Sequence, residues 1–274
     1  MQKGKNAEVN IISLKDSLIR EVKERLKDRL SREVEIAFKR IPRHIFVSEF
    51  INNLEEAYKN ENVLIKDTLG NVISFSSQPM VIAFMLEMLN LSPNLKVLEI
   101  GTGTGYNFAL MAKIVKDVSK IYSVEINPDL VQMAKNNLSK VGYKNTNIFQ
   151  EDGRYGFPEG SPYDRIIVTA EAQTIYYSWF EQLNNGGILV VPLFLPCWFI
   201  ESECKGIEYF YFPLKLYRKH RKFAGQFKGM PLIFMPLLGG ERIDRNEVMM
   251  KLNPLIKYVS KRTTGDEEKL IRFN

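Results

Sequence analysis

Residues 97–106, V-L-E-I-G-T-G-T-G-Y, constrain this chain more than any other stretch. An apolar strand pattern ends there, and glycines then occupy every second position before a helical pattern begins. Gly101, Gly103 and Gly105 allow the backbone to turn tightly and to approach a ligand without interference from a Cβ atom. The helix that follows directs its first backbone N–H groups at the same place. The stretch therefore predicts a strand, a ligand-binding loop and a helix, which is typical of a nucleotide-like cofactor pocket.

The spacing of the glycines distinguishes between two kinds of cofactor loop. A dinucleotide loop has the form G-x-G-x-x-G, but its third glycine position is Tyr106 here, which is too large for close helix–strand packing. The alternative is the G-x-G-x-G loop of enzymes that use S-adenosyl-L-methionine (SAM), usually preceded by an acidic residue, and Glu99 supplies that residue. We therefore expect SAM as the cofactor, with Thr102 and Tyr106 among the residues of the loop that bind it.

Two further acidic residues follow predicted strands, where such a cofactor needs acceptors. Glu125, with Ile126 next to it, lies about one βαβ unit after the glycines, and from there its carboxylate can accept both ribose hydroxyls. The alternative, an acid at a helix N-terminus, is weak because Asn127 already resembles the start of the next helix. Asp152, followed by Gly153, could accept from the adenine amino group, although a plain turn explains an Asp-Gly pair about as often.

The chain pattern from residue 96 to residue 191 alternates between strands and helices, which implies a parallel, doubly wound sheet with its ligand at the carboxyl ends of the strands. Amphipathic or apolar spacing also predicts helices over 11–30, 33–39 and 80–89, whereas 55–78 is irregular and predicts a loop that shapes a site. We expect three parts, at residues 1–90, 91–240 and 241–274. The predicted strands are 96–100, 121–125, 146–150, 163–169 and 187–191, and the predicted helices between them are 105–115, 128–140 and 176–183.

Composition narrows the remaining possibilities. No apolar run is long enough for a membrane span or a signal peptide, so we expect a cytoplasmic protein without a membrane partner. Cys197 and Cys204 lack the partners of a disulfide framework or a zinc site and are interpreted as free thiols. His44 and His220 lie in unrelated contexts, which argues against a histidine-based metal site or nucleophile. The basic residues 217–222 favour a solvated loop, or attraction of an acidic peptide, over nucleic acid.

Several short motifs follow one another along residues 33–240. They are A-F-x-x-I-P-R-H-x-F-V at 37–47, A-Y at 57–58, S-Q-P at 77–79, the glycine loop, D-G at 152–153, P-Y-D-R-I-I-V-T-A at 162–170, Q-L-x-x-G-G at 182–187 and F-M-P-L-L-G at 234–239. In this order and spacing they resemble the protein-L-isoaspartate O-methyltransferase family. The resemblance implies an α/β fold with a doubly wound, mostly parallel Rossmann-like sheet, that of class I SAM-dependent methyltransferases, with an N-terminal helical cap and a C-terminal extension.

The resemblance also implies the reaction and its central residue. Members transfer a methyl group from SAM to the carboxylate of an L-isoaspartyl residue in a protein or peptide, giving a methyl ester and S-adenosylhomocysteine. The resemblance makes Ser77 the catalytic residue, which would donate a hydrogen bond to the substrate carboxylate. Ser76 and Gln78, beside it, are then expected to bind substrate. The alternative for Ser77 is a structural one, the cap of a helix that begins near Pro79.

The segment after the strand at 163–169 should line the same cleft. Thr169 and Ala170 lie at the carboxyl end of that strand and are therefore expected to bind substrate. Glu171 is unusual beside a carboxylate substrate, because like charges oppose binding. We expect its side chain to point away or to contact a basic group of the substrate.

Two departures from the family pattern concern the substrate. Before Ser77 the chain has an insertion, and Phe75 replaces the usual threonine. The form G-x-x-I-S-x-S-S-Q-P at 70–79, together with G-T-G-Y-N at 103–107, resembles a divergent branch of the family whose members methylate aspartate in ribosomally made, modified peptides. Dedicated modification of one peptide is therefore an alternative to the repair of damaged proteins. A further alternative is a binding protein that keeps the SAM fold without catalysis, but the intact set of cofactor residues argues against it.

Overall fold

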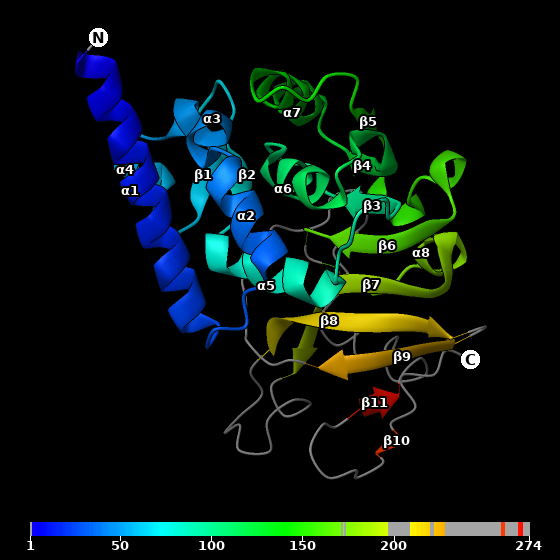
Figure 1. The fold of residues 1–274 in the computed structure, drawn as a ribbon. Helices are drawn as coiled ribbons and strands as arrows, with labels where there is room; N and C mark the ends of the chain where they lie inside the picture. Colours follow the sequence, from blue (N-terminus) through cyan, green and yellow to red (C-terminus); the bar gives the residue numbers. More distant parts are fainter. Residues whose placement is uncertain are drawn as a thin grey trace. The chain divides into compact units, whose positions relative to one another are not determined.

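The structure, a computed structural model, describes residues 2–170, 172, 174–196, 209–219, 222–227, 259–260 and 268–270 (Figure 1). The chain divides into two compact units, and each is assembled from separate segments. The first unit comprises Met1–Asn94, Thr102–Ile121 and Asn127–Ile148, and the second comprises Leu95–Gly101, Tyr122–Ile126 and Phe149–Asn274. The glycine loop is a covalent connection between them, since Gly101 ends a segment of the second unit and Thr102 begins one of the first.

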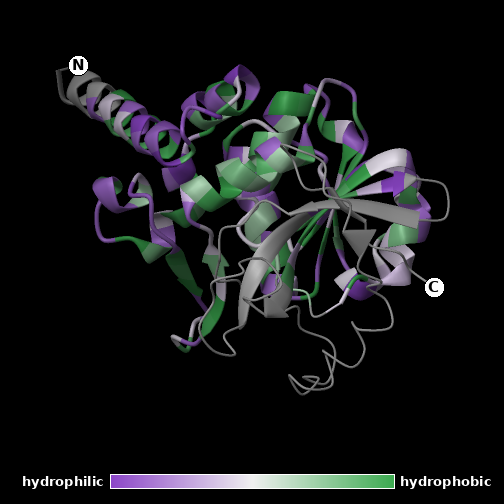
Figure 2. Ribbon diagram, turned by 90° about the horizontal axis from the view of Figure 1, so that it is seen from below, coloured by the Kyte–Doolittle hydropathy of each residue, from purple (hydrophilic) through white to green (hydrophobic). Residues whose placement is uncertain are grey.

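The first unit is mainly helical. Helix α2 packs against α1, α5 and α6, and α3 packs against α4 and α7. In Figure 2 the coloured part of the long helix α1 carries both hydrophilic and hydrophobic residues, and its buried apolar stripe is formed by Leu18, Ile19 and Val22. The helices are α1 (Gln2–Arg25), α2 (Arg32–Arg40), α3 (Arg43–Val47), α4 (Leu54–Ala57), α5 (Pro79–Leu89), α6 (Tyr106–Val115) and α7 (Pro128–Lys140).

Helix starts in this unit follow the capping rules. The Ser31 side chain accepts from the N–H of Val34 at the start of α2, and the Asn127 side chain accepts from two N–H groups in the first turn of α7. Pro128 occupies the first position of α7, where its missing N–H costs nothing. The predicted helices 33–39 and 128–140 are confirmed. Helix α1 begins nine residues earlier than the predicted helix 11–30, at Gln2.

The prediction of an irregular loop over 55–78 is wrong. The region contains α4 and an antiparallel hairpin of β1 (Val63–Lys66) and β2 (Val72–Ser76). In β1 the side chains of Val63 and Ile65 are buried while those between and after them are exposed. The turn is closed by Asp67, whose Oδ1 accepts from the N–H groups of Leu69 and Asn71 at 2.9 and 2.8 Å. A four-residue alternation is too short to identify a strand from sequence alone.

The second unit contains nearly all of a large sheet. Among the described residues its strand order is β10-β11-β9-β8-β7-β6-β3-β4-β5. Strands β3, β6 and β7 pair in parallel, whereas β8, β9, β11 and β10 continue the sheet in antiparallel pairs. The strands are β3 (Val97–Ile100), β4 (Ile121–Glu125), β5 (Asn147–Gln150), β6 (Tyr163–Val168), β7 (Leu183–Pro196), β8 (Tyr209–Lys219), β9 (Lys222–Phe227), β10 (Val259–Ser260) and β11 (Glu268–Leu270).

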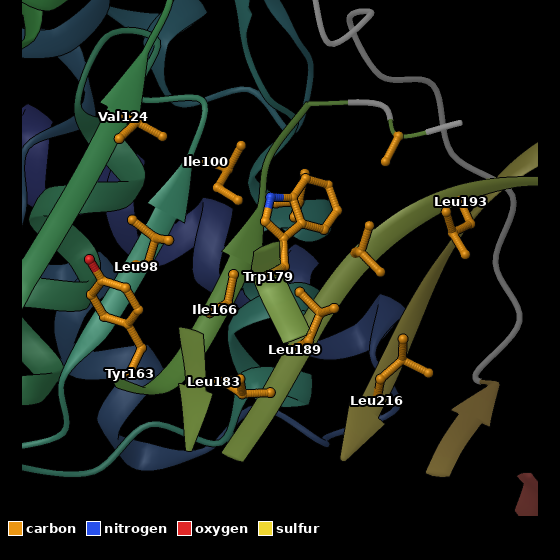
Figure 3. Close-up of a cluster of buried hydrophobic side chains, with 13 residues drawn as sticks. Leu98, Ile100, Val124, Tyr163, Ile166, Trp179, Leu183, Leu189, Leu193 and Leu216 are labelled. Atoms are coloured by element: carbon orange, nitrogen blue, oxygen red, sulfur yellow. The ribbon is translucent and has the colours of Figure 1, made fainter. Parts of the chain in front are cut away.

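Strands β3 to β7 agree with the predicted series, except that β7 extends well beyond the predicted strand 187–191 at both ends. The antiparallel strands β8 to β11 were not predicted. Helix α8 (Tyr177–Gln182) packs its Trp179 into the core of this unit (Figure 3). Trp179 is fully buried, and its Nε1–H donates to the Gly153 carbonyl oxygen at 2.7 Å, so the polar atom of the ring is satisfied. The core cluster comprises Leu98, Ile100, Val124, Tyr163, Ile166, Val168, Ala172, Trp179, Leu183, Leu189, Val191, Leu193 and Leu216.

Some predictions concern residues that the structure does not describe. Glu171, Cys197, Cys204 and His220 lie outside the described residues, as does the motif at 234–239. The basic stretch 217–222 is described in part, where β8 ends and β9 begins. The division at residues 90 and 240 stays a prediction. In the described part of the chain, no helix has both the length and the apolarity that crossing a membrane requires.

Candidate functional site

The second unit places two acidic residues at neighbouring strand ends. Glu99 in β3 is fully buried, and Ser123 of β4 donates its hydroxyl to Glu99 Oε2 at 2.7 Å. Glu125, the last residue of β4, is also buried. The two strand ends are joined where the N–H of Gly101 donates to the Val124 carbonyl oxygen at 2.9 Å. In Figure 3 β3, β4 and β6 run in the same direction, so these carboxylates lie at the carboxyl edge of the sheet, as predicted.

The first glycine of the loop is required by its surroundings. Gly101 has φ +96°, and a Cβ atom there would lie 2.8 Å from Thr169 Oγ1, too close for a real contact. Thr169 holds this turn: its N–H donates to the Ile100 carbonyl oxygen at 2.9 Å, and its hydroxyl lies within hydrogen-bond distance of the Ile100 and Gly101 carbonyl oxygens. The next residue, Ala170, also lies beside this glycine, with its backbone N atom 3.5 Å from where the Cβ atom of residue 101 would be. The Thr169 side chain thus supports the loop, and its predicted contact with substrate stays a prediction.

The remainder of the glycine loop belongs to the first unit. Thr102 is buried, and its carbonyl oxygen accepts from the N–H of Gly105 at 3.0 Å. At Gly105, with φ +86°, a Cβ atom would lie 3.2 Å from the Cβ of Ala134 in α7. The glycine therefore allows the start of α6 and helix α7 to approach closely. Gly103 also has a positive φ, of +53°.

Tyr106, predicted to bind the cofactor, begins α6 with its ring in the core of the first unit. The ring contacts Phe38 edge-on at a centroid distance of 6.3 Å and Phe46 at 5.4 Å. Burial raises the pKa of the phenol, so it stays neutral. The side chain is used for packing, and a cofactor contact would have to come from its backbone.

The ends of β4 and β5 are also linked within the second unit. The N–H of Glu151 donates to the Glu125 carbonyl oxygen at 3.1 Å, and Ile126, half-buried, continues the chain after Glu125. Asp152 and buried Gly153 then form the turn that follows β5. The predicted cofactor acids therefore come from adjacent strands, even though they are far apart in sequence.

Asp152 has a structural partner. Its side chain caps the short helix at Gly153–Tyr155, accepting from the Arg154 N–H at 3.0 Å, and its carboxylate pairs with the Arg154 guanidinium, with Nη2 at 2.6 Å from Oδ2. Burial opposes ionisation of Asp152, but the hydrogen bonds and charge of Arg154 outweigh it and lower the pKa of the carboxyl group. The turn interpretation of the Asp-Gly pair is thus confirmed, and the adenine contact stays a prediction.

The predicted substrate serines lie in the first unit, where β2 turns into α5. Ser76 is buried, and its Oγ has no hydrogen-bond partner among the described residues. Ser77 is half-buried. The N-cap of α5 is Gln78, without a side-chain cap, and the N–H of Met80 is instead satisfied by Asn60 Oδ1 at 2.9 Å. The alternative in which Ser77 caps this helix is therefore wrong.

Sequence reasoning missed the residues that hold this turn. Gln78 donates its backbone N–H to Asn62 Oδ1 at 2.6 Å and its side-chain Nε2 to the Asn60 carbonyl oxygen at 2.8 Å. Arg43 donates to the carbonyl oxygens of Ser76 and Ser77. The signal for Arg43 was its place in the I-P-R-H motif, whereas the asparagines gave no periodic signal.

The described polar groups are suited to binding and orienting organic ligands. Among the described residues, no group of three or more His, Cys, Asp or Glu side chains is arranged to hold a metal ion. The second unit offers carboxylates beside a glycine turn, and the first offers hydroxyl and amide donors at the serine turn.

Comparison with known proteins gives consistent matches. A family model described as "Protein-L-isoaspartate(D-aspartate) O-methyltransferase (PCMT)" matches residues 13–195. A protein-L-isoaspartate O-methyltransferase of Pyrococcus horikoshii is 43% identical over 163 residues, which are 60% of this chain and 70% of that protein. Another, of Methanococcoides burtonii, is 35% identical over 204 residues, which are 74% of this chain and 90% of that protein.

Solved structures are similar over most of the chain. One titled protein-L-isoaspartate O-methyltransferase is 29% identical, with a TM-score of 0.70, and the match covers 90% of this chain and 72% of that one. A Plasmodium falciparum protein, in complex with S-adenosyl-L-homocysteine, is 19% identical, with a TM-score of 0.63, over 81% of this chain and 96% of that one. The latter similarity is one of fold.

Proposed function

The chain belongs to the protein-L-isoaspartate(D-aspartate) O-methyltransferase family, and we propose that it transfers a methyl group from SAM to the carboxylate of an L-isoaspartyl residue in a protein or peptide. The products are a methyl ester and S-adenosylhomocysteine. The fold is that of class I SAM-dependent methyltransferases, as predicted. The enzyme class is accordingly that of SAM-dependent protein carboxyl O-methyltransferases.

The observation that supports this proposal most strongly is the turn after β3. Gly101 keeps this turn free of a side chain, since Thr169 Oγ1 occupies the place that a Cβ atom would take. The turn follows β3, which contains buried Glu99, and is hydrogen-bonded to β4, which ends at buried Glu125. A backbone without a side chain next to two carboxylates fits a ligand that has hydroxyl and amino donors on a compact nucleoside. These residues therefore suit SAM.

We assign the cofactor contacts as follows. Glu125 would accept from the ribose hydroxyls, and Asp152 would accept from the adenine amino group while its other contacts to Arg154 keep the carboxylate oriented. Glu99 and the glycine loop would hold the amino-acid end. When bound, SAM supplies an electrophilic methyl group on a sulfonium ion. The cofactor-binding residues in this proposal are Glu99, Gly101, Thr102, Gly103, Gly105, Tyr106, Glu125, Ile126, Asp152 and Gly153.

The substrate makes few chemical demands on the protein. A carboxyl group has a pKa of about 4 and is ionised at neutral pH, so its oxygen attacks without a general base. No proton is released, since the carboxylate oxygen forms the new bond to the methyl carbon. What remains is orientation, which we assign to the hydroxyl of Ser77, with Ser76, Gln78, Thr169 and Ala170 near the substrate.

Transfer of labelled methyl from SAM to three peptides at neutral pH tests the function. One is a flexible peptide with L-isoaspartate, the second is the same peptide with ordinary aspartate, and the third has aspartate in a constrained ring. We expect label on the isoaspartyl peptide, released as methanol by mild alkali because the product is an ester.

The matched aspartyl peptide is the control for recognition of the isopeptide linkage. Label only on the constrained aspartate would show that the protein modifies one dedicated peptide and does not repair damaged proteins. No label on any peptide, from protein that binds S-adenosylhomocysteine, would contradict carboxyl methylation altogether. The cytoplasmic location expected from the sequence stays a prediction.

A further inference from the structure

Arg43 is the most unusual charged residue of the first unit. Its side chain is fully buried, although arginine is rarely buried without an acidic partner. None of the ion pairs among the described residues includes it. Burial lowers the pKa of Arg43 to about 10, with the phenols of Tyr106 and Tyr58 acting in the opposite direction. The guanidinium is still charged at neutral pH, so other groups must compensate the lost hydration.

The compensation comes from backbone carbonyl groups on two separate segments. Arg43 Nη1 donates to the carbonyl oxygens of Ala57 and Lys59 at 3.0 and 3.1 Å. Arg43 Nη2 donates to that of Glu61 at 3.0 Å, and to those of Ser76 and Ser77 at 3.2 Å each. The guanidinium thus ties the chain between α4 and β1 to the end of β2.

The carbonyl groups of Ser76 and Ser77 both accept from one guanidinium, and this restricts the backbone conformation between them. Along an extended strand successive carbonyl groups point to opposite sides, so the chain must leave the strand conformation between Ser76 and Ser77 for both to reach Arg43. The peptide bond between them is trans, because among the described residues the cis bond is that of Ser161 and Pro162. In a trans peptide the N–H points opposite to the C=O, so the N–H of Ser77 points away from the guanidinium.

Ser76 and Ser77 have donors at this turn that find no acceptor among the described residues. Among the hydrogen bonds of the described residues, none uses the N–H or the hydroxyl of Ser77, and the buried Oγ of Ser76 has no partner either. The next N–H, that of Gln78, is occupied by Asn62. A buried cation at the carbonyl end of the first peptide polarises it, which makes the Ser77 N–H a stronger donor to an anion.

We propose that Arg43 is a positioning residue for methyl transfer: by holding the carbonyl groups of Ser76 and Ser77 it presents the N–H and the hydroxyl of Ser77 together to one substrate carboxylate. This inference rests on the proposed function and extends it, because it adds a backbone donor and names the group that orients it. Arginine is suited to this task, since its planar donors reach several carbonyl groups at once and a lysine ammonium cannot.

A double-mutant cycle of Arg43→Lys and Ser77→Ala tests the inference. With Ser77 present, Arg43→Lys should lower kcat/KM for the isoaspartyl peptide about a hundredfold, because a small misplacement of an orienting group has that effect. In the Ser77→Ala background the same change should cost less, since the hydroxyl is already gone and only the backbone N–H remains for Arg43 to orient. Affinity for S-adenosylhomocysteine should be unchanged in every variant. The exposed Arg40, treated as Arg40→Lys, is the matched control and should keep full activity.

Additive losses in the cycle would show that Arg43 acts only on the stability of the fold, and an unchanged kcat/KM for Arg43→Lys would equally overturn the inference. If the Arg43→Lys variant does not fold, a measurement on the unaltered protein tests the inference. Its Ser77 amide resonance, observed with ¹⁵N label, should shift when S-adenosylhomocysteine and the isoaspartyl peptide are added together, and should not with the aspartyl peptide. No shift would overturn the inference. Absence of methyl transfer by the unaltered protein would instead overturn the proposed function, and the inference with it.

Discussion

At the scale of single residues, the site depends on positions where the surroundings accept only one type of residue. Gly101 combines a left-handed φ with a neighbouring hydroxyl oxygen that excludes a Cβ atom. Arg43 combines full burial with five carbonyl acceptors. Glycine in a G-x-G-x-G pattern is visible in sequence, but the partners of a buried arginine are not. The role of Gly101 could therefore be predicted from the sequence, whereas that of Arg43 could not.

Gly101→Ala should weaken cofactor binding more than its backbone strain explains. The matched control is Gly142→Ala, because Gly142 has a similar φ of +91° but no atom within 4 Å of an added Cβ. The control should lose about 1 kcal/mol of unfolding free energy from the left-handed conformation alone. Gly101→Ala should lose more, and its affinity for S-adenosylhomocysteine should fall about tenfold or more, because the loop must move away from Thr169. Urea unfolding and calorimetric titration measure the two effects; equal affinities would contradict the argument.

At the scale of elements, the link between the hairpin and α5 is made by side chains instead of by a local cap. Asn60 is buried, accepts from the N–H of Met80 in α5, and donates to Glu21 of α1 at 3.2 Å. Its carbonyl oxygen also accepts from the Gln78 side chain. One residue from an apparently irregular stretch therefore connects α1, the entry to β1 and the start of α5.

Asn60→Ala should lower the free energy of unfolding by about 1–2 kcal/mol, since it leaves the first turn of α5 with an unsatisfied, buried N–H group. Urea denaturation monitored by circular dichroism measures the change. Asn136→Ala, at an exposed position of α7, is the matched control and should be neutral or slightly stabilising, because alanine has the higher helix propensity. A loss for Asn60→Ala no greater than for the control would show that α5 does not depend on this cap.

At the scale of the whole molecule, neither unit is a continuous piece of chain. The backbone passes from one unit to the other after residues 94, 101, 121, 126 and 148. Loss of structure in either unit releases segments whose ends are covalently held in the other. Such interleaving favours a single cooperative transition over independent unfolding.

We therefore expect coincident unfolding curves from probes of each unit. Far-UV circular dichroism reports mainly on the first unit, which contains α1 to α7. Fluorescence of buried Trp179 reports on the second, in a Trp198→Phe variant that leaves one tryptophan. The two urea midpoints should agree. Separate midpoints, with a plateau between them, would show that the units unfold independently.

The sequence alone was sufficient for the elements whose signals are local and repeated. Glycines at alternate positions, an apolar strand before them and an asparagine–proline helix start predicted β3, α6 and α7 with their bounds nearly correct. Motif order was sufficient for the family. The predicted acids Glu99 and Glu125 come together because parallel strands bring their carboxyl ends to one edge, a consequence of topology that strand alternation already implies.

Only the tertiary structure decided how the serine turn is held. The hairpin before Ser77 has too few residues to show periodicity, and the Asp67 turn that closes it depends on hydrogen bonds. The donors of Arg43 reach carbonyl groups up to 34 residues away, and Asn60 caps a helix 20 residues further along the chain. Backbone carbonyl and amide groups are the same in every residue, so a sequence does not reveal which of them a distant side chain will bind.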